Sequence, residues 1–351
     1  MPGSEKPSAG PGEALAEFYR QIEPDGLAPL WESLHNLVTA QPRTPAQPIL
    51  WDYDRRVRPH LMRSGELVTA EQAERRVLIL ENPGLRGRAA ATHSLYAGVQ
   101  LVLPGEIARA HRHSQSALRL VLESDGAYTT VNGERIAMAA GDLVTTPSWT
   151  WHDHGNQGAA PAVWVDVLDV PLVATLDASF AEPSVEAAQT VAIAPGAGLA
   201  RFGRNMLPVD WQPLEPYSPI FHYPYALARA TLAELAEAGE PDACHGYKMR
   251  HVNPATGDFV LPTIGTFLQA LPAGFEGAPY RATDATVCIA MEGEGETRIG
   301  ATVLGWKPRD IFVIPAWATY RHRTPRGAVL FSASDRPAQR KLGLWREQRG
   351  V

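Results

Sequence analysis

The chain has 351 residues, of which 45% are hydrophobic and 20% are charged, a composition typical of a folded globular protein. At about 150 residues per domain, this length predicts two domains or one large one. The formal net charge of -6 disfavours a nucleic-acid partner, because binding a phosphate backbone favours a surplus of basic residues. The two cysteines, Cys244 and Cys288, cannot build a disulfide scaffold or a tetrathiolate zinc site.

No targeting or membrane segment is expected. The N-terminus lacks a basic stretch followed by an apolar one. No apolar run reaches the roughly 18–20 residues that a membrane helix needs, and Asp166 and Asp169 interrupt the most apolar stretch, residues 161–176. We therefore expect a cytoplasmic protein with neither a membrane nor a nucleic acid as partner.

The first part of the chain is predicted to be irregular and then helical. Residues 1–12 are rich in Pro, Gly and Ser and are expected to form a disordered tail. Residues 13–21 and 29–39 have helical spacing of apolar side chains, and residues 69–75 begin with a threonine cap. We assign residues 13–75 to an N-terminal helical arm.

From about residue 76 the pattern changes to short strands separated by turns. Predicted strands cover residues 77–80, 94–103, 117–123, 128–131, 143–146 and 163–170. The pair Asn132-Gly133 between two of them is a strong hairpin signal. We assign residues 76–184 to a first barrel and residues 185–245 to a linker with a helix at 224–238.

The strand pattern returns in residues 246–351, and the two halves resemble each other. Gly-Asp-Leu at 141–143, followed by Pro-Ser-Trp at 147–149, matches Arg-Asp-Ile at 309–311, followed by Pro-Ala-Trp at 315–317. A duplication of this kind predicts two barrels of one type. The expected fold class is therefore mainly β, with short N-terminal and inter-barrel helices.

Four of the 11 histidines fall in two close pairs, His-Arg-His at 111–113 and His-Asp-His at 152–154. Residues i and i+2 of a strand share a face, so both pairs can project into one barrel interior. Arg119 has the same parity as the first pair, and an unbroken strand points it to the same side. We expect Arg119 to hold a substrate carboxylate by charge-assisted hydrogen bonds, the alternative being a surface arginine.

The residues that frame these histidines resemble the two cupin motifs. Gly105 precedes the first pair, and Gly141, Pro147 and Asn156 frame the second. The sequence departs from the motifs at Trp149, where glycine is usual. It also lacks the glutamate ligand that usually follows the first pair, which implies a site of three neutral histidines.

The wider sequence, about residues 28–348, is similar to the gentisate 1,2-dioxygenase family of bicupin ring-cleavage enzymes. The most specific blocks are Ser-Gln-Ser-Ala-Leu-Arg at 114–119 and Trp-Thr-Trp-His-Asp-His at 149–154. The resemblance implies a bicupin made of two double-stranded β-helix (jelly-roll) barrels. It also implies a homo-oligomer, typically a tetramer.

The resemblance further implies the residues of the site. Fe(II) is expected on His111, His113 and His152. The catalytic residues would be His154 and Arg119, and the substrate-binding residues Arg75, Gln100, Tyr96 and Asp166. Which of Arg75 and Arg76 faces the site is left open. The second barrel is expected to hold no metal, because Tyr280, Ala282 and Tyr320 stand at the ligand positions.

The implied reaction inserts both atoms of O2 between the carboxyl-bearing C1 and the hydroxyl-bearing C2 of a salicylate-type acid. Gentisate, giving maleylpyruvate, is the first choice; salicylate, its 5-amino, 5-nitro and 5-halo derivatives, and 1-hydroxy-2-naphthoate stay open. His154 is expected to act as a general acid/base, since an ordinary histidine pKa of about 6.5 suits that task.

Two other classes of protein remain as alternatives. A non-oxidative metallo-cupin, such as an isomerase, usually keeps the glutamate ligand that is missing here. A non-enzymatic bicupin does not explain four histidines kept in one barrel and lost at the ligand positions of the other.

Overall fold

The computed structural model describes residues 11–351, and the chain divides into two compact units at Arg43. In the first unit lie α1 (Pro11–Ile22), the 3-10 helix η1 (Glu23–Asp25) and α2 (Leu30–Leu37). The hydroxyl of Tyr19 accepts a hydrogen bond from Trp31 Nε1 (2.8 Å) and donates one to Glu32 (2.5 Å), which links the two α-helices. The disordered tail is predicted for residues 1–12. Residues 1–10 lie outside the described part of the chain, and α1 begins at Pro11, within the predicted tail.

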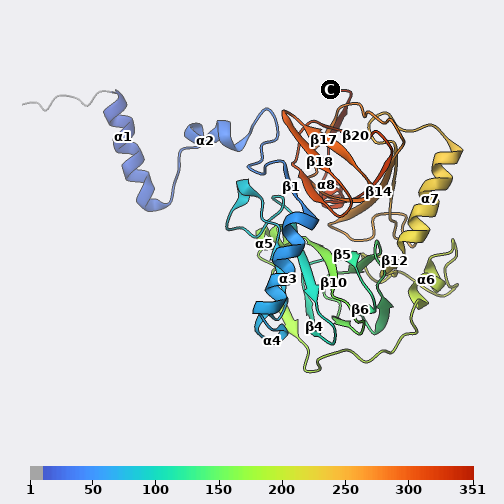
Figure 1. The fold of residues 1–351 in the computed structure, drawn as a ribbon. Helices are drawn as coiled ribbons and strands as arrows, with labels where there is room; N and C mark the ends of the chain where they lie inside the picture. The colour runs from blue at the N-terminus through green and yellow to red at the C-terminus, as the bar shows by residue number, and fades with distance from the viewer. Residues whose placement is uncertain (1–10) are drawn as a thin grey trace, which may run out of the picture. The chain divides into compact units, whose positions relative to one another are not determined.

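Two antiparallel sheets form the first barrel of the second unit (Figure 1). One has the strand order β12-β8-β5-β10-β3-β2 and the other the order β11-β4-β9-β6-β7. The strands are β2 (Val77–Ile79), β3 (Tyr96–Val102), β4 (Ile107–His113), β5 (Ala117–Glu123), β6 (Ala127–Val131), β7 (Glu134–Ala137), β8 (Leu143–Thr146), β9 (His152–Asn156), β10 (Ala162–Leu168), β11 (Ala181–Pro183) and β12 (His222–Tyr223).

The second barrel repeats this arrangement, as the duplicated sequence predicts. Its sheets have the orders β1-β19-β16-β21-β14-β13 and β18-β17-β20-β15-β22. The strands are β1 (Ile49–Trp51), β13 (Tyr247–Arg250), β14 (Gly265–Leu271), β15 (Tyr280–Ala282), β16 (Thr286–Gly293), β17 (Gly295–Ile299), β18 (Thr302–Trp306), β19 (Ile311–Ile314), β20 (Tyr320–Arg323), β21 (Ala328–Ser334) and β22 (Glu347–Arg349). The mainly β, two-barrel prediction is confirmed.

Each barrel takes an edge strand from outside its own stretch of sequence. β1 precedes the first barrel in the chain but pairs with β19 of the second, with Ile49 opposite Val313. β12 belongs to the linker and pairs with β8 of the first barrel, with His222 opposite Val144. The two barrels are therefore interlocked, and part of the segment assigned to the helical arm is a strand.

The remaining helices lie around the barrels. They are the π-helix η2 (Tyr53–Val57), α3 (Arg58–Leu67), α4 (Ala70–Ala73), the 3-10 helix η3 (Pro83–Leu85), α5 (Val170–Thr175), α6 (Ala197–Phe202), α7 (Tyr225–Ala238) and α8 (Arg336–Lys341). The sequence predicts α4 and α7 but not α3. The segment of α3 is mostly polar and shows no clear apolar stripe, although its Leu61 is fully buried. None of the helices among residues 11–351 is long and apolar enough to cross a membrane.

Strand alternation divides the side chains between a shared core and the barrel interiors. On β5, Leu118 and Leu120 join one hydrophobic cluster that draws on both six-stranded sheets. Val121, of the opposite parity, packs inside the first barrel with Trp164. The same parity turns Arg119 inward, where it is only 3% exposed.

Trp149 adopts the left-handed backbone conformation for which the cupin motif usually uses glycine. Its φ is 61°, and Trp317, at the matching place in the second barrel, has the same value. A side chain in this conformation costs about 1–2 kcal/mol. Stacking offsets part of that cost, because the Arg112 guanidinium lies 4.5 Å from the Trp149 ring centroid and 4.7 Å from that of Trp151.

Candidate active site

Three histidines meet inside the first barrel. His111 and His113 end β4, His152 begins β9, and the two strands pair with His111 opposite His152. One ring nitrogen from each lies within 4.8 Å of the other two. Among residues 11–351, this is the only group of three or more His, Cys, Asp or Glu side chains close enough to hold one metal ion.

A main-chain carbonyl lies beside the Nδ1 atom of each histidine. The distances are 3.3 Å from His111 to the oxygen of Arg109, 2.8 Å from His113 to that of Gln115, and 3.0 Å from His152 to that of Thr150. Because a carbonyl only accepts, the contacts of His113 and His152 place the ring proton on Nδ1 and leave Nε2 free to bind a metal. His111 Nδ1 also lies 2.5 Å from a nitrogen of Arg75, which can only donate, so its contact with the Arg109 carbonyl does not fix its tautomer. His152 Nε2 is buried without a partner, so these residues fit a metal ion.

All three imidazoles are held in the neutral form that binds metals. Burial is the main cause: it lowers the pKa of His111 to about 3 and that of His113 to about 4, and it holds the pKa of His152 well below 6.5. Nearby arginine charges act in the same direction. The donor set is therefore three neutral nitrogens, as the missing glutamate implies.

His154 lies next to this group, with its ring centroid 5.7 Å from that of His152. Its Nδ1 is 2.9 Å from the Thr129 hydroxyl, which is also positioned to donate to the sulfur of Met138 at 3.3 Å. Burial and the charge of Arg119 hold the pKa of His154 well below 6.5. The pKa of His154 in the folded protein is thus lower than the unperturbed value of about 6.5, and the neutral ring is favoured.

Arg119 and Asp166 form a buried ion pair beside the histidines, with Nε and Oδ1 3.3 Å apart but not aligned as a hydrogen bond. Arg119 also donates to the Thr146 hydroxyl at 2.5 Å. Trp164 Nε1 donates to Asp166 Oδ2 at 3.0 Å. Burial outweighs the attraction of Arg119 and raises the pKa of Asp166 to about 6.

The structure resolves which of the two neighbouring arginines points toward the histidines. A terminal nitrogen of Arg75 lies 2.5 Å from His111 Nδ1 and donates to the Arg109 carbonyl at 2.8 Å. Arg76 points elsewhere and forms a two-pronged ion pair with Glu106, at 2.8 and 2.9 Å. Arg75 is thus the one at the site.

Tyr96 and Gln100 lie on β3 with the parity of its inward face. Between them is Gly98, directly opposite Asp166 in the strand pairing. A Cβ atom added to Gly98 would come within 2.5 Å of the Tyr96 hydroxyl and 2.6 Å of Val77. The Tyr96 ring therefore lies over this glycine, close to Asp166. Gln100 is 3% exposed and pairs with Trp164 across the sheet.

The second barrel keeps the surroundings of the site but not the ligands. Tyr280 and Tyr320 stand opposite each other, as His111 and His152 do in the first barrel. Ala282 accepts a hydrogen bond from the backbone of Trp317, as His113 does from Trp149. The group of metal-binding side chains is confined to the first barrel within the described chain.

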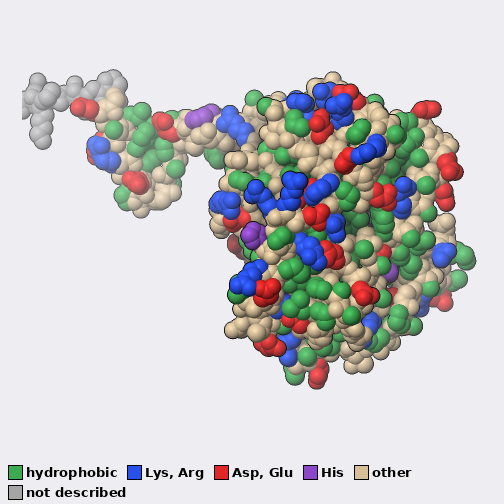
Figure 2. Space-filling model, viewed as in Figure 1, with side chains coloured by type: hydrophobic (Ala, Val, Ile, Leu, Met, Phe, Trp, Pro, Cys, Tyr) green, Lys and Arg blue, Asp and Glu red, His purple; other side chains and the backbone are tan. Residues whose placement is uncertain are grey.

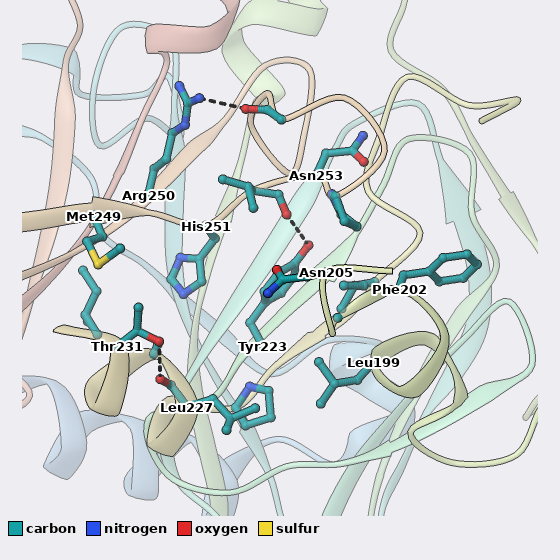
Figure 3. Close-up of a pocket in the computed structure, with 18 of the residues that line it drawn as sticks. Leu199, Phe202, Asn205, Tyr223, Leu227, Thr231, Met249, Arg250, His251 and Asn253 are labelled. Carbon is teal, nitrogen blue, oxygen red and sulfur yellow. Dashed lines mark hydrogen bonds between the residues drawn. The ribbon is translucent and has the colours of Figure 1, made fainter. Parts of the chain in front are cut away.

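The cavity drawn in Figure 3 is separate from the histidine group. It has a volume of about 840 Å³ and lies among α6, α7 and β13. Its lining includes Phe202, Tyr223, Leu227, Met249 and His251, and none of the predicted site residues. On the face shown in Figure 2, Lys and Arg side chains are interspersed with Asp and Glu. Neither feature alters the assignment of the site.

Sequence reasoning missed several residues that hold the site in place. Thr129, Thr146 and Trp164 contact His154, Arg119 and Asp166 respectively. Asn132, found only as a turn residue, accepts a hydrogen bond from the Trp151 backbone at 3.1 Å. Strand parity shows that Thr129 shares a barrel face with its neighbours, but only the pairing of β6 with β9 brings it to His154.

Comparisons with known proteins agree with this geometry. Residues 98–168 match the cupin domain family. The chain is 50% identical to gentisate 1,2 dioxygenase 1 of Aquipseudomonas alcaligenes, over 99% of this chain and all of that one. It is 38% identical to 5-aminosalicylate 1,2-dioxygenase of a Comamonas species, over 95% of this chain and 90% of that one.

A solved structure extends the similarity to the whole fold. Salicylate 1,2-dioxygenase of Pseudoaminobacter salicylatoxidans, in adducts with gentisate, is 32% identical with a TM-score of 0.91, covering 98% of this chain and 95% of that one. Identity at this level over the full length of several relatives shows common descent rather than a shared fold alone. The chain therefore belongs to the gentisate 1,2-dioxygenase family of bicupin, aromatic ring-cleaving dioxygenases.

Proposed function

We propose that the protein is an Fe(II)-dependent gentisate 1,2-dioxygenase that opens the ring between C1 and C2. The observation that carries the proposal is a group of three neutral histidines within 4.8 Å of one another, beside two inward-pointing arginines. Membership of the family supplies the reaction class. The 50% identity to a gentisate dioxygenase over the full length favours gentisate among the possible acids.

His111, His113 and His152 would hold the metal, and the Nδ1 contacts of His113 and His152 leave their Nε2 atoms as the ligands. Bound there, Fe(II) would supply open positions for a chelating hydroxy acid and for O2, together with the electrons that activate O2. Because all three ligands are neutral, the site keeps the full charge of the metal ion and favours an anionic substrate.

Arg75 and Arg119 would hold the substrate carboxylate. Arg119 is already oriented by Thr146 and Asp166, so little side-chain freedom is lost when it binds an anion. Arg75 and Arg119 are positively charged and Asp166 is negatively charged, so the net charge of these three groups beside the histidines is +1. This surplus attracts the carboxylate and fixes the orientation of the ring.

His154 would accept the proton of the substrate's 2-hydroxyl group. The Thr129 hydroxyl can donate to Met138 while its oxygen accepts from His154 Nδ1–H, which leaves Nε2 as a free acceptor. The neutral ring offers its Nε2 lone pair to that proton, and the charge of a bound anionic substrate would offset the burial and the arginine charges that lower the pKa of His154. The proton could return to an oxygen of the product during ring opening.

Substrate choice, assembly and location complete the proposal. Gentisate carries a ring hydroxyl that salicylate lacks, and Tyr96 places a phenol on the inward face of β3 that could bind it. A homo-oligomer, typically a tetramer in this family, and a cytoplasmic location remain predictions.

Oxygen uptake by Fe(II)-loaded protein tests the proposal. The panel would be gentisate, salicylate, 5-aminosalicylate, 5-nitrosalicylate, 5-chlorosalicylate and 1-hydroxy-2-naphthoate, with His111→Ala as the inactive control. Fastest uptake with gentisate, accompanied by maleylpyruvate, supports the assignment. Uptake confined to acids without the ring hydroxyl would move it to the salicylate-type members, and no uptake with any of them would overturn it.

A further inference from the structure

A single peptide group links one of the metal-ligand histidines to a buried carboxylate. The carbonyl of Gln115 accepts a hydrogen bond from His113 Nδ1 at 2.8 Å. The N–H at the other side of the same peptide, that of Ser116, donates to Asp169 Oδ1 at 2.9 Å. Because a peptide group is planar and rigid, holding its N–H also fixes the direction of its carbonyl.

The carboxylate is held in turn by the second barrel. Thr263, in the segment that leads into β14, donates its hydroxyl hydrogen to Asp169 Oδ2 at 2.5 Å. Asp169 itself follows β10 of the first barrel and is 2% exposed. A continuous path of three hydrogen bonds therefore runs from Thr263 through Asp169 and the peptide group to the ring of His113.

We propose that Asp169 and Thr263 are positioning residues for His113. Through these two residues the second barrel orients a metal ligand in the first barrel. The inference rests on the proposed metal site. A negative charge at the peptide N–H polarises the peptide and makes its carbonyl a stronger acceptor. The carbonyl then fixes the His113 tautomer and makes its Nε2 a better ligand.

The duplication of the fold provides a matched control inside the same chain. In the second barrel, Asp335 Oδ1 accepts from the backbone N–H of Ala285 at 2.9 Å, as Asp169 accepts from Ser116. The carbonyl of that peptide belongs to Asp284, and the residue at the place of His113 is Ala282. Removing the Asp335 carboxylate thus breaks the equivalent contact where there is no ring to orient.

The first experiment compares Asp169→Ala with Asp335→Ala. It measures Fe(II) affinity by competition with a chromophoric chelator, and thermal stability without metal. Contacts that orient a ligand typically change metal affinity by about 10–100-fold. We expect both variants to lower the melting temperature and only Asp169→Ala to weaken Fe(II) binding to that extent. Unchanged affinity in Asp169→Ala, or equal loss in both variants, would overturn the proposal.

Two smaller substitutions at Thr263 test the hydrogen bond between the second barrel and Asp169. They also test the proposal if Asp169→Ala does not fold. Thr263→Val removes only the hydroxyl, whereas Thr263→Ser keeps it. We expect weaker metal binding and an altered Co(II) absorption spectrum in the first, with both properties restored in the second. Wild-type affinity and spectrum in Thr263→Val would remove the second barrel from the inference.

A last variant separates this inference from the assignment of the metal site. His113→Ala should abolish tight metal binding if His113 is a ligand. If it binds Fe(II) like the wild type, the proposed site is wrong. If it loses the metal while Thr263→Val and Asp169→Ala retain full affinity, the site stands and only the positioning role fails.

Discussion

Thr129 Oγ1 and His154 Nδ1 lie 2.9 Å apart, and the second barrel repeats this contact between Thr297 and His322 at 2.8 Å. The pair therefore accompanies the barrel fold even where the ligand positions hold no histidine. In the first barrel the contact has a chemical consequence, because it decides which nitrogen of His154 is free to accept a proton.

Replacing Thr129 with valine should slow the reaction without removing the metal. The change keeps the shape of the side chain but leaves His154 Nδ1 buried without a partner, at a cost of about 1–3 kcal/mol. We expect kcat to fall roughly tenfold, as the ring loses its fixed tautomer, with the Fe(II) content unchanged. Thr297→Val, in the second barrel, is the control and should leave kcat unaltered. Equal kcat in Thr129→Val and the wild type would show that His154 needs no orientation.

The ionisation of Asp166 should set the acid limb of the pH profile. Burial raises its pKa to about 6, so it is ionised above that pH and protonated below it. Protonation removes the charge that orients Arg119, while Tyr96 and Arg75, which also face Asp166, keep their protonation states. We expect kcat/KM for gentisate to fall as the pH drops below about 6. In Asp166→Asn it should be lower throughout and flat between pH 5 and 8; an unchanged acid limb would assign it to another group.

Tyr96 should distinguish gentisate from salicylate. Its phenol lies over Gly98, beside Asp166, and burial raises its pKa so that the hydroxyl stays protonated. Tyr96→Phe removes one hydrogen bond to the additional ring hydroxyl of gentisate, a loss of about 0.5–1.5 kcal/mol. We expect KM for gentisate to rise roughly three- to tenfold and KM for salicylate to stay constant. Parallel changes for both acids would place the hydroxyl away from the ring substituent.

The contrast between the two arginines marks the limit of what the sequence can predict. Strand parity places Arg119 inside the barrel because β5 is unbroken between Ala117 and Glu123. No such rule applies to Arg75 and Arg76, because the chain leaves α4 through Glu74, whose backbone has a positive φ of 53° and a ψ of -48°. Glutamate rarely has a positive φ, so the sequence does not predict the turn at Glu74 that points the Arg75 and Arg76 side chains in different directions.

Contacts between distant segments set a second limit. The duplication and the paired histidines predict two barrels and one metal-binding group, and the two-barrel fold is confirmed. The contact between Asp169 and Thr263 joins residues 94 positions apart and depends on how the barrels pack. Periodicity within one strand contains no information on that packing, so the supporting residues appear only in the structure.

Arg75→Ala and Arg76→Ala should fail in different ways, although the two residues are adjacent. Arg75 reaches His111, so its loss should raise KM for gentisate by tenfold or more while the melting temperature stays near that of the wild type. Arg76 pairs with Glu106 and is 6% exposed, so its loss leaves a carboxylate without its partner and should destabilise the fold by about 3 kcal/mol. Thermal unfolding and steady-state kinetics on both variants separate the two effects. A stable Arg76→Ala with a raised KM would reverse the assignment of the two residues.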